Sequence, residues 1–335
     1  MKNEHKAIDF FKLFFSFCVV AIHAGLFFEF KFGYYLKTLI LRLAVPYFFL
    51  CNGYFLAQKK GNDKEIAKKQ IKKLLPNYII FGILFSVMYN LFELDTFNIM
   101  NLYKSITELI ILKPITIMWY VATLIIFYIA AIHLNFPKNI KKLIITFACL
   151  YILGIIIFTY NPKINTDSVS FVIFIKKIFY NPRCAIFTLL FPLLGYYIGY
   201  NKIEKGLKKQ TIIIFFVISM ICFFMEAKSY YPTSLKYNEY DFMIFTPIVS
   251  TLLFLLIINS NLKSKYITQT FRIISQQLFY YHYIFVYILY YFKRKYNLCN
   301  LTSLCKSYFN FFNILLLTFT LILIINYIKK KRGNK

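Results

Sequence analysis

The first apolar segment of the chain carries polar side chains whose spacing suits acid–base chemistry. Asp9 and Lys12 are three residues apart and share a helix face, and Ser16 lies near the same stripe. His23 follows Lys12 by eleven residues, almost three helical turns, so it projects from that face as well. An imidazole titrates near neutral pH, which makes His23 a candidate general base. Two structural interpretations stay open: an interfacial Asp9–Lys12 pair that sets topology, and a hydrogen-bonded packing histidine.

The second apolar segment places a cation at about the same depth as that histidine. Arg42 stands near its outer end, and Pro46 is expected to kink the helix. Asn52 and Gly53 form a small polar pair that permits the close approach of another helix. An arginine facing a histidine would form a site for an oxyanion beside a base. The alternative is that Arg42 snorkels to the outer headgroups.

The composition indicates that helices crossing a membrane carry these residues. Of the 335 residues, 59% are hydrophobic and only 16% are charged, whereas soluble domains are about 25% charged. The net charge of +27 does not indicate a nucleic-acid-binding protein, because no segment has the composition of a soluble basic fold. We expect an all-α, polytopic integral membrane helix bundle with about ten spans. The expected spans are 8–28, 38–57, 74–92, 117–134, 143–160, 183–200, 210–226, 242–259, 273–291 and 309–328.

The distribution of Lys and Arg sets the expected orientation. With the N-terminus in the cytoplasm, basic residues are more than twice as dense in the inner segments as in the outer ones, so both termini are predicted to be cytoplasmic. Three basic residues, Lys12, Arg42 and Arg183, fall inside the expected spans instead. The outer loops 93–116 and 161–182 contain apolar stretches that lie along the interface or re-enter the membrane. No internal repeat is visible, and residues 1–335 are expected to form a single membrane-embedded domain.

The motifs together resemble a known family. Asp9, Lys12 and His23 look like the N-terminal signature of the bacterial integral-membrane acyltransferase family 3, which carries an Asp, a basic residue and then a His. Further segments are similar to that family's motifs, in the same order along the chain: Arg42 with Pro46, Asn52-Gly53, the basic loop 68–73 entering the third span, Met118-Trp119-Tyr120, and Ser275 to His282. Lys12 stands where the family usually has Arg, the basic loop has Lys in place of Arg, and Asn52 replaces the usual Ser, which puts a hydroxyl role there in doubt.

The resemblance implies the transfer of an acyl group, commonly acetyl, from an acyl-CoA. The acceptor would be a hydroxyl of a cell-surface glycan or of its lipid-linked precursor, and the site would be the bacterial cytoplasmic membrane. His23 would be the general base and Arg42 would stabilise the oxyanion or orient the acceptor, while Asp9 would hold Lys12 for contact with the donor. A direct transfer is preferred, and a covalent route through a nearby Ser or Cys stays open.

The remaining expected site residues concern the donor and the substrate path. Four lysines would bind the phosphates of CoA, or else they serve only as the positive-inside signal: Lys68, Lys69, Lys72 and Lys73. Asn52, Trp119 and His282 are expected along the substrate path, although His282 is equally well explained as a packing residue.

Other kinds of site are not indicated. No spacing of His, Cys and acidic residues suggests a metal, and no tightly bound cofactor is expected. Cys299 and Cys305 share the last outer loop and can form a disulfide there if that loop is outside. Expected partners are the bilayer, the acyl-CoA, the glycan and enzymes that make surface polysaccharides. The alternative function is a transporter or flippase for a glycolipid or a small acid, because buried charges also suit transport.

Overall fold

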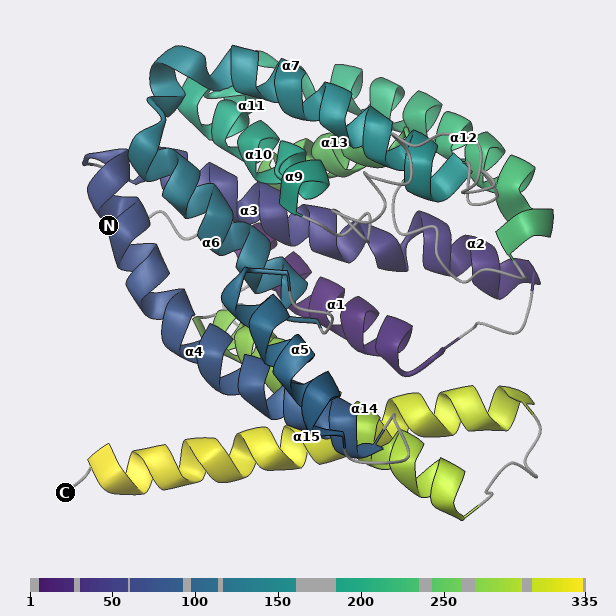
Figure 1. The fold of residues 1–335 in the computed structure, drawn as a ribbon. Coiled ribbons are helices and arrows are strands. Elements are labelled where there is room, and N and C mark those ends of the chain that lie inside the picture. Colours follow the sequence, from purple (N-terminus) through teal and green to yellow (C-terminus); the bar gives the residue numbers. More distant parts are fainter. Residues whose placement is uncertain are drawn as a thin grey trace. The chain divides into compact units, whose positions relative to one another are not determined.

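The computed structural model describes residues 6–26, 31–59, 61–92, 98–113, 117–160, 185–234, 243–260, 269–296 and 303–333. Every regular element within these residues is helical, which confirms the predicted all-α class (Figure 1). Arg183, the loop 161–182 and Cys299 lie outside the described residues. The elements are α1 (Lys6–His23), α2 (Lys31–Leu39), η1 (Leu41–Leu43), α3 (Ala44–Gln58), α4 (Asp63–Phe92), α5 (Ile99–Ile110), α6 (Trp119–His133), α7 (Phe136–Ile155), η2 (Ile156–Tyr160), α9 (Ala185–Thr188), α10 (Leu190–Asn201), α11 (Ile203–Gly206), α12 (Lys209–Ser234), α13 (Thr246–Ile258), α14 (Gln269–Lys295) and α15 (Ser303–Gly333).

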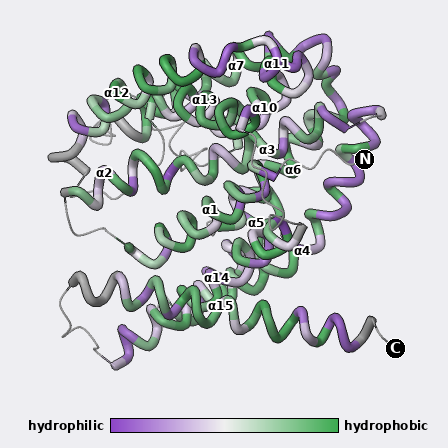
Figure 2. Tube along the Cα trace, turned by 180° about the vertical axis from the view of Figure 1, so that it is seen from behind, coloured by the Kyte–Doolittle hydropathy of each residue, from purple (hydrophilic) through white to green (hydrophobic). Residues whose placement is uncertain are grey.

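Several of these helices have the length and composition of membrane spans. Among the described residues, five stretches are long and apolar enough to cross a bilayer, namely 32–58, 63–92, 136–158, 209–230 and 308–331, and three shorter helices are also apolar. Large apolar side chains such as Ile214, Phe215 and Ile221 are exposed along α12, as expected of a helix that faces lipid. Figure 2 shows α15 as apolar along most of its length and hydrophilic at its C-terminal end. The count of about ten spans and their orientation stay predictions.

The basic segment before the third expected span is helical, so its prediction as a loop was wrong. Helix α4 begins at Asp63 and continues through the lysines to Phe92. The Asn62 side chain caps it by accepting a hydrogen bond of 3.0 Å from the backbone N–H of Lys64. Lysine is a good helix former, and the acids in the first turn complement the helix dipole. Pro76 lies inside the helix without ending it.

The second expected span is interrupted, as predicted from Pro46. The chain leaves the α-helix in the 3₁₀ turn η1, which contains Arg42. A proline ring clashes with the carbonyl four residues before it, which here is the carbonyl of Arg42. Pro46 itself lies in the first turn of α3, where no backbone donor is needed. Arg42 therefore occupies the break between α2 and α3.

The chain divides into two compact units, each built from segments far apart in the sequence. The first comprises Met1–Ala44, Ile83–Lys104 and Ser260–Lys335, and the second comprises Val45–Gly82 and Ser105–Asn259. In the first unit, α14 packs on both α1 and α15, with Val20, Ala24, Val286 and Ile314 in a common core. The core of the second unit is aromatic and includes Phe49, Phe127, Phe136, Phe191 and Tyr196.

Helices α3 and α10 pack backbone to backbone in the second unit. A Cβ added to Gly53 would lie 1.8 Å from the carbonyl oxygen of Pro192, and one added to Gly195 would lie 2.1 Å from that of Leu50. These distances are far below van der Waals contact, so only glycine fits at either position. The predicted role of Gly53 in a close helix approach is confirmed.

The outer segment 93–116 contains an amphipathic helix, α5. Its buried face carries Ser105 and Leu109, and its other face exposes apolar side chains that include Ile99, Met100 and Ile110. A helix with one buried face and one exposed apolar face suits a membrane interface. The choice between an interfacial and a re-entrant segment stays open.

Candidate active site

The polar residues of α1 meet a matching series on α14. Asp9, Ser16 and His23 recur every seven residues, and seven residues are close to two helical turns, so all three lie on one face. On α14, Arg272, Ser275 and His282 are spaced by three and then seven residues and also share a face. These residues contact one another in the same order along both helices. The two helices therefore run parallel.

The first contact is an ion pair between Asp9 and Arg272. Nε of Arg272 donates to one carboxylate oxygen of Asp9 at 3.0 Å, and Nη2 donates to the other at 2.6 Å. The side chain of Asp9 is only 7% exposed, whereas that of Arg272 is 45% exposed. Two parallel hydrogen bonds of this kind give the strongest geometry of an arginine–carboxylate pair. The pair fastens the N-terminal end of α1 to α14.

The second contact joins two hydroxyl groups. Oγ of Ser16 and Oγ of Ser275 are 2.7 Å apart, and both serines are buried. Each Oγ also lies near the backbone carbonyl oxygen of Lys12, at 2.9 Å from Ser16 and 3.1 Å from Ser275, so one hydroxyl can donate to this carbonyl while the other donates across the pair. The serines hold the two helix backbones close together at this level.

The third contact places two imidazoles side by side. The ring centroids of His23 and His282 are 5.4 Å apart, and the ring of Tyr283 lies 4.9 Å from His23 in an edge-to-face arrangement. His282 is fully buried and its Nδ1 lies 2.7 Å from the carbonyl oxygen of Leu278, so Nδ1 carries the proton. Its Nε2 is then an acceptor, and this buried atom has no hydrogen-bond partner among the described residues.

The three contacts form a polar ladder that is about 21 Å long from Asp9 to His23 at the rise of an α-helix. One end is an ion pair, and the other end offers imidazole nitrogens able to accept or pass on a proton. Arg42 belongs to the same unit, because η1 packs against α1. The side chains of Lys12, His23 and Arg42 are each half-buried.

The predicted site residues divide between the two units. Asp9, Lys12, His23, Arg42 and His282 fall in the first unit. The second unit contains the expected donor and path residues Asn52, Lys68, Lys69, Lys72, Lys73 and Trp119.

Asn52 and Trp119 have structural roles in the second unit. The amide of Asn52 donates to the carbonyl of Phe48 at 2.8 Å and to the hydroxyl of Tyr120 at 3.0 Å, and its oxygen accepts from Tyr128 at 3.2 Å. This network ties α3 to α6. The indole of Trp119 packs 6.0 Å from the ring of Phe49.

The four expected donor lysines all lie exposed on α4. Lys68 forms a surface ion pair of 3.0 Å with Glu65, which is worth little in water. The pKa of Lys59 is lowered below the usual lysine value. The larger cause is burial of its amine, and the smaller cause is the nearby positive charge of Lys73.

Arg272 is a member of this polar series that the sequence-based interpretation did not single out. It was counted with the loop 260–272, whereas the structure places it in α14. Arg272 and Ser275 are three residues apart and therefore share a helical face. This spacing could have indicated from the sequence that Arg272 belongs with Ser275 and His282.

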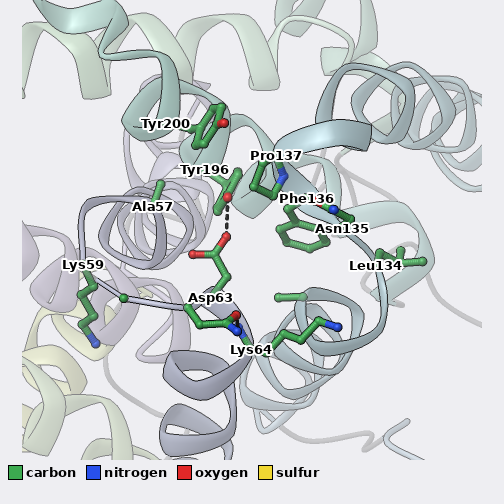
Figure 3. Close-up of a pocket in the computed structure, with 13 residues that line it drawn as sticks. Ala57, Lys59, Asp63, Lys64, Leu134, Asn135, Phe136, Pro137, Tyr196 and Tyr200 are labelled. Atoms are coloured by element: carbon green, nitrogen blue, oxygen red, sulfur yellow. Dashed lines mark hydrogen bonds between the residues drawn. The ribbon is translucent and has the colours of Figure 1, made fainter.

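A cavity of about 480 Å³ lies in the second unit, beside the turn that joins α3 to α4 (Figure 3). The α6–α7 turn and the end of α10 complete its walls. The lining residues include Lys59, Asn62, Asp63, Lys64, Asn135, Phe136, Tyr196 and Tyr200. Within the part of the chain that the structure describes, no group of three or more His, Cys, Asp or Glu residues could hold a metal ion.

Comparison with known proteins identifies the family. Two curated relatives are similar over part of their length: an amino-acid racemase of Enterococcus faecalis, 29% identical over 231 residues, and a serine/alanine racemase of Enterococcus gallinarum, 27% identical over 268 residues. The alignments cover 66% and 77% of this chain but only 31% and 37% of the relatives, so the chain spans about a third of their length. No solved structure matches it. A family model for an acyltransferase domain matches residues 5–329, nearly the whole sequence, and the chain therefore belongs to acyltransferase family 3.

Proposed function

We propose that this protein is a membrane O-acyltransferase that moves an acyl group, commonly acetyl, from an acyl-CoA to a hydroxyl of a cell-surface glycan or a lipid-linked saccharide. It would act in a bacterial cytoplasmic membrane beside enzymes that make surface polysaccharides. Family membership supports the reaction class. The observation that carries the proposal is the contact between His23 and the buried His282 on the parallel helices α1 and α14.

The proposed reaction is a direct transfer. His23 takes the proton from the acceptor hydroxyl as that oxygen attacks the thioester carbonyl carbon. Arg42 stabilises the negative charge that develops on the carbonyl oxygen of the tetrahedral intermediate. When the intermediate collapses, the carbon–sulfur bond breaks and the CoA thiolate takes the proton from His23. The products are the acyl ester and free CoA, and His23 is neutral again.

The other two contacts of the ladder would support this reaction by positioning His23. The Asp9–Arg272 pair and the two serines hold α1 against α14, and so keep His23 beside His282. His282 would line the path of the acceptor, and Lys12 would contact the donor. The hydroxyl of Ser16 is already engaged with Ser275 and a backbone carbonyl, which favours direct transfer over an acyl-serine at that position.

The test is the mass of the surface glycan in cells that carry His23→Ala at normal protein levels. We expect the ester mass to disappear, because no other group in the proposed mechanism accepts the hydroxyl proton. His133→Ala is the matched control, since His133 is an exposed histidine at the end of α6. Retained esterification in His23→Ala cells would remove the general-base role.

The ion pair of Asp9 and Arg272, in which the carboxylate is buried, also suits a second candidate, a transporter or flippase for a glycolipid or a small acid. Both relatives are named as racemases of amino acids, and an amino acid is one small acid that such a transporter could carry. Two measurements on a deletion strain separate the candidates. Loss of the ester with glycan export intact supports the enzyme, whereas loss of export or of amino-acid uptake supports the transporter.

A further inference from the structure

The cavity in the second unit is built where four helices begin or end. Helix α3 ends at Gln58 and α4 begins at Asp63, while α6 ends at His133 and α7 begins at Phe136. The last two turns of α10 supply Tyr196 and Tyr200. Figure 3 shows Asp63 pointing toward Tyr196, Lys59 at the left with its amine turned away from the other labelled side chains, Lys64 at the bottom, and Asn135 to Pro137 at the right. A volume of about 480 Å³ falls in the range of small-molecule sites.

The charges around this cavity favour an anionic ligand. Lys59 and Lys64 line it, and Lys73 lies near Lys59. The lowered pKa of Lys59 reflects burial first and then repulsion from Lys73, and a bound anion would offset that repulsion. The N-terminal turns of α4 and α7 both border the cavity, and each adds the positive end of a helix dipole.

The remaining lining groups suit a nucleotide better than an isolated phosphate ion. Tyr200 is 47% exposed and stacks on Tyr196, with ring centroids 5.9 Å apart and planes 11° from parallel. The hydroxyl of Tyr196 donates to Asp63, which fixes the lower ring of this stack (Figure 3). An exposed tyrosine face can stack on a base. The carboxylate of Asp63 would repel a simple anion but can accept a hydrogen bond from the free 2′-hydroxyl of the CoA ribose.

We propose that this cavity binds the phosphorylated nucleotide end of the acyl-CoA, with Lys59 and Lys64 at the phosphates and Tyr200 under the base. The proposal rests on the proposed function, because that function supplies the donor. It places the phosphates at the α3–α4 turn, and the exposed lysines from Lys68 to Lys72 are left outside the site. The headgroup of an anionic lipid shares the phosphate chemistry, so the experiment separates the two sources.

Calorimetric titration of CoA into the purified full-length protein tests this proposal. The protein is held in nanodiscs of phosphatidylcholine, so that no anionic lipid competes. We expect Lys59→Gln with Lys64→Gln, and separately Tyr200→Leu, each to weaken CoA binding about tenfold, by loss of charge-assisted hydrogen bonds and of stacking. Lys142→Gln and Tyr103→Leu are matched controls, because both residues are exposed and neither lines the cavity, so the affinity should stay unchanged.

Three outcomes overturn the proposal in different ways. Wild-type affinity for CoA in correctly folded cavity variants would place the donor elsewhere and leave the proposed function standing. Inorganic pyrophosphate binding as tightly as CoA, with displacement by vesicles rich in phosphatidylglycerol, would make the cavity a headgroup site. If the wild-type protein binds no CoA at all, the cavity proposal and the choice of donor both fail, while the glycan ester test still decides whether the protein is an acyltransferase. Thermal unfolding midpoints of each variant establish that it is folded.

Discussion

At the scale of single residues, the contact between Asp9 and Arg272 changes the interpretation of the N-terminal motif. The sequence predicted a local ion pair between Asp9 and Lys12, one helical turn away. In the structure both carboxylate oxygens of Asp9 accept hydrogen bonds from Arg272, which is 263 residues further along the chain. The acid of the motif thus joins two helices.

We expect Arg272→Gln to lower the free energy of unfolding by about 2–3 kcal/mol, because Asp9 keeps a buried charge without its bidentate partner. The value is below the range for a fully buried pair, since the side chain of Arg272 is 45% exposed. Arg272→Lys should lose less, because it keeps the charge but not the two parallel hydrogen bonds. Denaturant unfolding in detergent measures both.

The double variant Asp9→Asn with Arg272→Gln should recover part of that loss, since it leaves no unpaired buried charge. Arg294→Gln is the matched control, because Arg294 is exposed on the same helix and should change stability by no more than about 0.5 kcal/mol. Equal destabilisation by Arg272→Gln and by this control would show that the ion pair contributes nothing to the fold.

At the scale of elements, the decisive feature is how closely α3 and α10 approach. Gly53 and Gly195 face the backbone carbonyls of the partner helix, which cannot move aside as a flexible side chain could. Glycine at such contacts is a common device for packing helices where lipid offers no hydrophobic driving force.

We expect Gly53→Ala and Gly195→Ala each to destabilise the protein by about 3 kcal/mol or more, because the added methyl group must push two helix backbones apart. Gly206→Ala is the control, since a Cβ there meets nothing within 4 Å. The thermal unfolding midpoint of the purified variants measures the effect. A wild-type midpoint for Gly53→Ala would contradict the close packing of these helices.

At the scale of the whole molecule, the positive-inside distribution predicts that both termini are cytoplasmic. A green fluorescent protein joined after Lys335 should therefore fluoresce, and alkaline phosphatase at the same point should be inactive, because these reporters work on opposite sides of the membrane. Fusions after Lys113, in an expected outer segment, provide the opposite control. The reverse pattern at Lys335 would contradict a cytoplasmic C-terminus and would mean either an odd number of spans or the opposite orientation of the whole chain.

The helical class and the apolar helices could be predicted from the sequence, because they depend on composition and on local periodicity. The motif residues on α1 were also visible, since their spacing refers to a single helix. Element boundaries were less accurate. The basic loop turned out to be the first half of α4. The break that Pro46 predicted is present and lies at Arg42, because a proline disrupts the helix at the residue four positions before it.

Which residues meet across the fold emerged with the three-dimensional structure. The spacing of Asp9, Ser16 and His23 was enough to place them on one face of a helix, since helical geometry is a local property of the chain. It did not determine that this face would lie against Arg272, Ser275 and His282, nor that Lys59 and Tyr200 would border one cavity. Such pairings arise from packing between segments far apart in the chain, where many partners of similar polarity compete and only the full set of contacts selects one.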